Sequence, residues 1–131
     1  MKAVILAGGK GQRMGEAWLD TPKPMMEVGG IPVLEHQVRL LVSYGFTDLT
    51  IVTGHLSQQI EQHFRDGMEF GLHISYFVEK NPLGTTGALK EMEPHLPGEF
   101  LVIYGDVMLD MDLQRMWRFH KDKNADCTLA V

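Results

Sequence analysis

The residues best suited to chemistry stand near the start of the chain, where an apolar run gives way to glycine. Residues 2–6 are followed by four glycines between positions 8 and 15, and two cations, Arg13 and Lys23, stand in or shortly after that segment. Glycine lets backbone N–H groups approach an anion closely, while Arg and Lys add positive charge. We therefore predict a strand that ends in a phosphate-binding loop.

Two common phosphate-binding loops do not fit this segment. The Walker type requires Ser or Thr after its glycine–lysine pair, whereas Lys10 is followed here by Gly11. The dinucleotide fingerprint finds its first two glycines at Gly9 and Gly11, but Met14 stands in the third position. Two prolines soon after also oppose a helix that starts directly from the turn. The segment therefore matches neither of these two types of phosphate-binding loop, and we expect it to belong to another type.

The composition limits the class of protein. The chain has 131 residues, of which 44% are apolar, enough for one core of ordinary size. Its net charge of −5 argues against non-specific nucleic-acid binding, and no apolar run approaches the ~20 residues of a membrane span. The single cysteine, Cys127, cannot form an internal disulfide, which favours the cytoplasm, and we predict it as a small apolar residue of a strand.

Strands and helices are predicted to alternate along the chain. Apolar runs indicate strands, and apolar residues at helical spacing between capping and breaking residues indicate helices, while 7–25 is expected to be a long loop. The predicted strands are 2–6, 49–53, 73–78, 100–104 and the beginning of one at 128–131; the predicted helices are 33–44, 57–64 with Ser57 as N-cap, 85–92, and 113–121 with Asp112 as N-cap. This order predicts an α/β fold, a Rossmann-like three-layer sandwich with a mostly parallel sheet.

The end of the chain bears on its domain organisation. Residues 128–131 begin a strand that no helix follows. Domains seldom end on an unfinished α/β unit. We expect residues 1–131 to form a single domain that is part of a longer protein and is truncated on its C-terminal side.

Ligands of parallel sheets bind beyond the carboxyl ends of the strands. This rule selects the loops 7–15, 53–55, 79–87 and 105–106. These loops combine glycine with polar or charged residues. The six histidines have no metal-ligand spacing, so we expect them to be structural.

Four segments resemble the sugar-phosphate nucleotidylyltransferases, which join a nucleoside triphosphate to a sugar 1-phosphate and release pyrophosphate. Leu-Ala-Gly-Gly-x-Gly-x-Arg-Met at 6–14 and Thr-Pro-Lys-Pro at 21–24 match the signature, and Pro82–Leu89 and Tyr104–Val107 look like the base-side loop and the metal-carboxylate strand end. Gln12 and Thr86 depart from the usual residues, and neither side chain is needed for the chemistry. The resemblance covers the whole chain and implies the nucleotide-diphospho-sugar transferase fold.

The resemblance also implies roles for particular residues. Both reactants are anions, so the catalyst must neutralise charge and hold the groups in line. Arg13 would hold the two phosphates that leave together, Lys23 would contact the α-phosphate or the incoming phosphate, and Asp106 would bind Mg²⁺. The implied nucleotide-binding residues are Leu6, Ala7, Gly8, Gly9, Gly11, Glu79, Gly84, Thr85 and Gly87.

Glu79 bears on the choice of nucleobase. A carboxylate only accepts hydrogen bonds, and guanine offers two adjacent donors where uracil offers one. Gly87 leaves room for a purine. The pattern is most similar to heptose 1-phosphate or mannose 1-phosphate guanylyltransferases, which implies GTP and a sugar 1-phosphate as substrates.

Two alternatives stay open. One is a uridylyl- or cytidylyltransferase acting on another sugar or amino alcohol phosphate, and the other is a non-catalytic module that binds nucleotide sugars. Arg13, Lys23 and Asp106 together favour catalysis over the second. The family's sugar-contacting residues and second metal carboxylate lie beyond position 131, so we expect the 131-residue piece alone to be inactive. No nucleic-acid or membrane partner is expected, and a homo-oligomer is compatible with the sequence.

Overall fold

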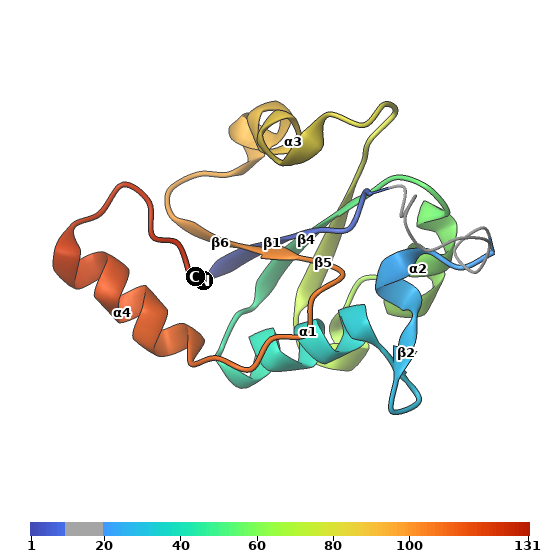
Figure 1. The fold of residues 1–131 in the computed structure, drawn as a ribbon, viewed down its shortest axis with the longest axis horizontal. Helices are drawn as coiled ribbons and strands as arrows, with labels where there is room; N and C mark the ends of the chain where they lie inside the picture. The colour runs from blue at the N-terminus through green and yellow to red at the C-terminus, as the bar shows by residue number, and fades with distance from the viewer. Residues whose placement is uncertain (10–19) are drawn as a thin grey trace.

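The computed structural model describes residues 1–9 and 20–131 and contains one main sheet flanked by helices (Figure 1). The sheet strands are β1 (Lys2–Leu6), β4 (Asp48–Thr53), β5 (His73–Val78) and β6 (Phe100–Tyr104), and the α-helices are α1 (Val33–Ser43), α2 (Ser57–Phe64), α3 (Gly84–Met92) and α4 (Leu113–Lys123). Three short 3-10 helices occur at η2 (Lys23–Met25), η3 (Met68–Phe70) and η4 (Glu93–His95), and β2 (Glu27–Val28) pairs with β3 (Ile31–Pro32) as a small hairpin.

All four strands of the main sheet run parallel, in the order β5-β4-β1-β6. The chain leaves β1 towards β4 and β5, and then returns to β6 on the other side of β1. Right-handed crossovers place helices on opposite faces when the direction of travel reverses. The reversal opens a crevice at the carboxyl ends of β1 and β6, where ligands of such sheets bind.

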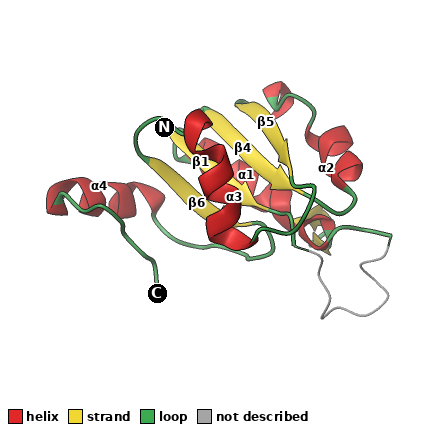
Figure 2. Ribbon diagram, turned by 90° about the horizontal axis from the view of Figure 1, so that it is seen from above, coloured by secondary structure: helices red, strands yellow, loops and turns green. Residues whose placement is uncertain are grey.

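The helices cover both faces of the sheet (Figure 2). Alternate residues of β1 point to opposite faces, because side chains alternate along a strand. Ala3 and Ile5 belong to the core on the side of α1, while Val4 packs with Ala88 and Met92 of α3 on the other. This three-layer arrangement confirms the predicted α/β class.

Most predicted elements occur within one or two residues of their expected ends, and Asp112 caps α4 by accepting from the Arg115 N–H at 2.9 Å. Ser57 is not an N-cap, because α2 begins after Leu56, whose φ of 57° is left-handed. The sequence predicts a loop over 7–25, whereas the structure contains the short 3-10 helix η2 at the end of that segment. Within the described part of this segment, Pro22 and Pro24 favour such a short turn.

The prediction of a strand at 128–131 is wrong for this structure. The segment is irregular, and Leu129 is 79% exposed. An apolar run forms a strand only where a neighbouring strand supplies hydrogen bonds, and no described strand pairs with this one. Cys127 is accordingly exposed rather than buried in a strand.

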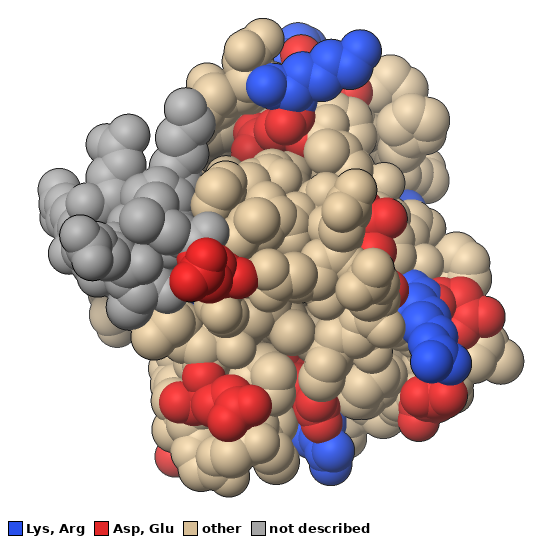
Figure 3. Space-filling model, turned by 90° about the vertical axis from the view of Figure 1, so that its right-hand side faces the viewer, with Lys and Arg blue, Asp and Glu red and all other residues tan. Residues whose placement is uncertain are grey.

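Charged side chains are dispersed over the face shown in Figure 3. On the face in Figure 3, the Lys and Arg side chains lie apart from one another and beside Asp or Glu. The described helices have at most 11 residues, and none has the length and apolar character needed to cross a membrane.

A nearly buried carboxylate links α1 to α2. Glu35 accepts from Arg39 Nε at 2.8 Å, and its other oxygen lies 2.7 Å from His63 Nε2. Burial raises the pKa of Glu35, but the hydrogen bonds from His63 and Arg39 lower it more, so the net pKa lies below the ordinary value of 4.5. This carboxylate is therefore more stable as an anion in the folded than in the unfolded state.

We expect Glu35 to contribute to acid sensitivity. A carboxyl whose pKa is lower in the folded state stabilises the fold above its unfolded pKa, near 4.5, and that contribution is lost as the pH falls through the folded pKa. Glu35→Gln should lower the free energy of unfolding at neutral pH by about 1 to 3 kcal/mol. It should also flatten the decline of that free energy in acid, as measured by urea denaturation.

Glu69→Gln is the matched control. Glu69 pairs with Arg65 at 3.6 Å, but both side chains are more than two thirds exposed, at 74% and 73%. Exposed pairs contribute little to stability. Equal losses in the two variants would contradict a special role for Glu35.

Candidate active site

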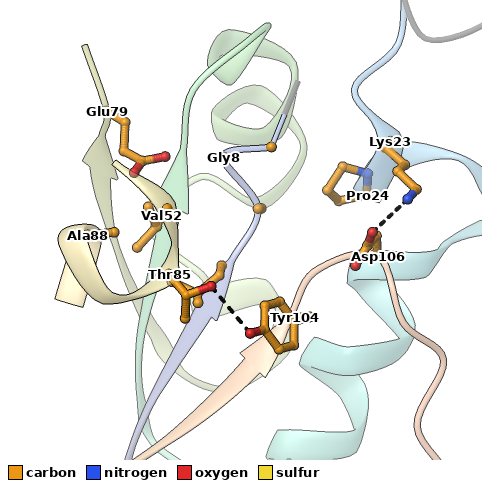
Figure 4. A pocket seen from close by; sticks show the side chains of 13 residues that line it. Gly8, Lys23, Pro24, Val52, Glu79, Thr85, Ala88, Tyr104 and Asp106 are labelled. Carbon is orange, nitrogen blue, oxygen red and sulfur yellow. Dashed lines mark hydrogen bonds and ion pairs between the residues drawn. The ribbon is translucent and has the colours of Figure 1, made fainter. Parts of the chain in front are cut away.

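A pocket of about 220 Å³ opens at the carboxyl ends of the parallel strands, at the crevice where the strand order reverses (Figure 4). Its lining comes from the ends of β1, β4, β5 and β6, from η2 and from α3. The lining residues are Leu6, Ala7, Gly8, Gly9, Lys23, Pro24, Val52, Glu79, Gly84, Thr85, Ala88, Tyr104 and Asp106.

Neighbouring strands hold the loop that follows β1 in place. The Ala7 N–H donates to Val52 O at 2.8 Å, and the Gly105 N–H donates to Leu6 O at 2.9 Å. A Cβ at Gly54 would lie only 2.9 Å from Gly8 O, so a side chain there would force the backbone apart. The loop therefore keeps its shape because a glycine of the β4 turn packs directly against it.

The next two amides of this loop, those of Gly8 and Gly9, lie at the pocket. Within the described part of the chain, no backbone hydrogen bond takes the N–H of Gly8 or Gly9. Both residues line the pocket, and Gly9 is exposed. Unpaired N–H groups of successive residues are suited to phosphate oxygens.

Glu79 and the start of α3 lie towards one end of the pocket (Figure 4). The Glu79 N–H donates to Thr53 O at 2.8 Å, and a Cβ at Gly8 would collide with the Glu79 carboxylate. The first N–H groups of α3, at Gly84 and Thr85, have no partner within the helix. This end combines an acceptor with several donors, the pattern that a nucleobase and its ribose require.

Lys23 and Asp106 lie towards the opposite end (Figure 4). Lys23 Nζ is 2.7 Å from Asp106 Oδ2, and the two side chains are 37% and 38% exposed. Thr85 Oγ1 lies 3.3 Å from the Tyr104 hydroxyl between the two ends. A cation and an anion in contact at the pocket edge can each bind a ligand group of the opposite charge.

The donor set fits Mg²⁺ only in combination with a substrate. Within residues 1–9 and 20–131, no group of three or more His, Cys, Asp or Glu side chains could hold a metal. Mg²⁺ is commonly bound by one or two carboxylates plus substrate phosphates and waters. Asp106 is one carboxylate at the pocket and pairs there with a cationic group, Lys23 Nζ, so the residues present fit a metal that a substrate would help to hold.

The pocket brings together most residues selected from the sequence. Leu6, Ala7, Gly8, Gly9, Lys23, Glu79, Gly84, Thr85 and Asp106 line it, whereas Arg13 and Gly11 lie outside the described residues. Gly87 is not among the lining residues; a Cβ there would meet Leu83 Cβ at 2.7 Å, so the glycine permits packing within the start of α3. Ala88 lines the pocket instead.

Sequence reasoning missed Pro24, Val52, Ala88 and Tyr104 as lining residues. Pro24, Val52 and Ala88 are apolar, so no chemical signal marks them. Tyr104 stands immediately before the Gly-Asp pair at the end of β6, and that position gave the available clue.

The chain matches the family model described as nucleotidyl transferase over residues 2–131. It is 38% identical to the UTP–glucose-1-phosphate uridylyltransferase of Synechocystis sp., a match over all of this chain and 37% of that protein. It is 35% identical to the mannose-1-phosphate guanylyltransferase of Mycobacterium tuberculosis, over 98% of this chain and 36% of that protein. The chain thus spans little more than a third of the length of these relatives.

A solved structure has the same fold. The crystal structure of HddC from Yersinia pseudotuberculosis complexed with GMP-PN superposes with a TM-score of 0.81 at 28% sequence identity, covering 92% of this chain and 54% of that one. The fold is that of the nucleotide-diphospho-sugar transferases, as the motifs predict. The chain therefore belongs to the nucleotidyl transferase family and is a member of its sugar-phosphate nucleotidyltransferases.

Proposed function

We propose that the protein carrying this chain transfers a guanylyl group from GTP to a sugar 1-phosphate, with Mg²⁺, and releases pyrophosphate. The observation that carries the proposal is the pocket itself. Glu79 and the start of α3 line one end of it, Lys23 and Asp106 form an ion pair at the other end, and the amides of Gly8 and Gly9, which donate to no backbone group among the described residues, belong to its lining as well.

The phosphate end supplies charge rather than acid–base chemistry. The sugar phosphate oxygen attacks the α-phosphorus as the bond to pyrophosphate breaks, so negative charge develops on the bridging oxygen that leaves with pyrophosphate, between groups that are already anionic. Lys23 binds the α-phosphate or the incoming phosphate, while the amides of Gly8 and Gly9 bind the triphosphate. Arg13 stays a prediction from the motif as the cation that holds the leaving phosphates.

Asp106 is the proposed Mg²⁺ ligand of this chain. When bound, the metal supplies positive charge to phosphate oxygens of the triphosphate. The pairing of Asp106 with Lys23 supports this role, because replacing the ammonium group by a metal would leave Lys23 free for a phosphate oxygen.

The activity is proposed for the whole protein, since this chain spans 37% and 36% of the relatives named above. Sugar-contacting residues and a second metal carboxylate are expected in the part that those relatives have in addition. We propose that residues 1–131 form the nucleotide-binding part of one domain, with a cytoplasmic location supported by the single cysteine. The isolated 131-residue piece should give no turnover.

The direct test is pyrophosphate release by the complete protein. GTP, UTP, TTP and CTP are each paired with mannose 1-phosphate, heptose 1-phosphate and glucose 1-phosphate, with Mg²⁺ and with EDTA. Release with GTP and one sugar phosphate, abolished by EDTA, is expected. No release with any pair would overturn the assignment and favour a nucleotide-sugar-binding module.

Glu79 is the proposed reader of guanine. Its carboxylate accepts hydrogen bonds only, so it matches the two adjacent donors on the edge of guanine. The similarity to a mannose-1-phosphate guanylyltransferase and to a structure complexed with GMP-PN supports GTP. The equally extensive match to a glucose-1-phosphate uridylyltransferase makes UTP the second candidate.

Glu79→Gln should lower kcat/KM for GTP by about 10- to 100-fold, because one acceptor oxygen is replaced by an NH₂ group that faces a donor of guanine. Steady-state kinetics with GTP and UTP measure the change. Glu91→Gln, an exposed carboxylate of α3 outside the pocket lining, is the control and should keep the wild-type preference. A wild-type preference for UTP would replace the guanylyl assignment with the uridylyl one.

A further inference from the structure

Gln37 of α1 is a buried polar residue that holds the loop carrying Asp106. Its side chain is 1% exposed. Its Nε2 donates to Tyr104 O at 2.6 Å and also to Val107 O. These two carbonyls bracket Asp106 in the sequence, so one side-chain amide spans the turn that follows β6.

Both donors of the Gln37 amide are used on this turn. Its Oε1 is buried and has no hydrogen-bond partner among the described residues. The reverse orientation of the amide would set Oε1 against two carbonyl oxygens, which repel it. The observed orientation leaves an acceptor unpaired, a cost that buried polar groups rarely carry. The contacts to the turn therefore determine how this side chain is oriented.

The same helix is also attached to the segment that carries Lys23. The Val33 N–H, at the start of α1, donates to Met26 O at 3.0 Å, immediately after η2. Helix α1 thus contacts both segments whose charged side chains meet at 2.7 Å in the pocket. Gln37 does not line the pocket itself.

We propose that Gln37 is a positioning residue for metal binding, which fixes the Asp106 turn relative to α1 and so to Lys23. The inference rests on the proposed function, because Asp106 is taken as the metal ligand. Groups that hydrogen-bond behind metal ligands commonly change metal affinity or activity by about 10- to 100-fold when replaced. Here the Gln37 amide would act on Asp106 through the backbone carbonyls of Tyr104 and Val107, which lie on either side of Asp106 in the sequence.

Gln37→Met tests the proposal in the complete protein. Met has a side chain of similar length and volume but no donor, so the packing is kept and both carbonyls lose their partner. Mn²⁺ binding in the presence of a non-hydrolysable GTP analogue, followed by electron paramagnetic resonance, should weaken by about 10- to 100-fold. The Mg²⁺ concentration for half-maximal pyrophosphate release should rise in parallel, while metal-free binding of the analogue should stay unchanged.

Val38→Ala is the matched control. It truncates a fully buried apolar side chain on the same helix and should lower thermal stability without changing Mn²⁺ affinity. If both variants alter Mn²⁺ binding equally, or Gln37→Met leaves it unchanged, the positioning role is overturned. A loss of metal-free analogue binding in Gln37→Met, equal to the loss of Mn²⁺ binding, would also overturn it.

Gln37→Glu provides a second variant if Gln37→Met does not fold. Its ionised carboxylate would repel the carbonyls of Tyr104 and Val107, so the Mn²⁺ affinity should fall at neutral pH and partly recover in mild acid, where the protonated group donates once. An affinity equal to wild type at every pH would contradict the proposal. If wild type itself binds no Mn²⁺ with the nucleotide analogue, the proposed function fails, and this inference fails with it.

Discussion

Lys23→Ala should lower kcat for pyrophosphate release by about 100- to 1,000-fold, the usual effect of removing one preorganised group that stabilises charge in the transition state. The cation lies at the pocket edge, 2.7 Å from Asp106, and two prolines flank it in sequence. These prolines restrict the backbone, so little order has to be imposed when a phosphate binds. Steady-state kinetics of the complete protein measure the loss.

The same substitution should hardly change stability. Side chains that are 37% and 38% exposed form a pair worth about 0 to 1 kcal/mol. Lys90→Ala removes another paired lysine, from α3, and should leave kcat at the wild-type level. A wild-type kcat for Lys23→Ala would remove Lys23 from the catalytic machinery, and a large loss of stability would make its role structural.

Asp106→Asn should have an effect of similar size, through the metal. An amide is a neutral and weaker ligand than a carboxylate, and metal stabilisation of phosphate charge is worth several kcal/mol, which corresponds to about 100- to 1,000-fold in rate. We expect part of the loss to be recovered at high Mg²⁺ or with Mn²⁺. A titration of rate against metal concentration distinguishes weaker metal binding from slower chemistry.

The pair of Lys2 and Asp48 offers a control for this substitution. Asp48 lies 3.8 Å from Lys2, and these residues are the first of β4 and β1. They therefore lie at the amino ends of the strands, whereas the pocket lies at the carboxyl ends. Asp48→Asn should therefore leave kcat and its metal dependence unchanged. The metal role of Asp106 is refuted if the two variants respond to Mg²⁺ in the same way.

The sequence predicts the sheet and its site edge well, because the signals are local. The apolar runs at β1, β4, β5 and β6 are bounded by turn residues, and the rule about carboxyl ends of parallel strands needs only their order. The glycine segment, Lys23, Glu79 and Asp106 could all be selected in this way.

What the sequence does not predict depends on contacts between distant segments. The pairing of Lys23 with Asp106 joins residues far apart in the chain, and no spacing rule reports it. Gly87 is selected by its place in the motif of residues 82–89, whereas the structure places Ala88 in the pocket lining, because a motif does not report which positions of a helix face a pocket. The support from Gln37 is invisible since a buried glutamine has no chemical signature.

The interpretation of the apolar end shows the limit of propensity. Residues 128–131 are rich in strand-forming side chains, but strand structure is a property of a pair of segments. Leu56 gives the reverse case, since a residue with no turn preference adopts a left-handed backbone ahead of α2. In both places the backbone conformation depends on contacts with other segments, and those contacts cannot be read from a single sequence.

The bonds that extend the sheet past its strand ends have a kinetic consequence. Ala7, Glu79 and Gly105 each stand one residue beyond a strand. Their N–H groups donate to carbonyl oxygens of the neighbouring strand at 2.8, 2.8 and 2.9 Å. Their exchange with deuterium should then be as slow as that of the central strands, because these ends do not fray locally. On heating, the capacity to bind nucleotide and the sheet itself should be lost in one step.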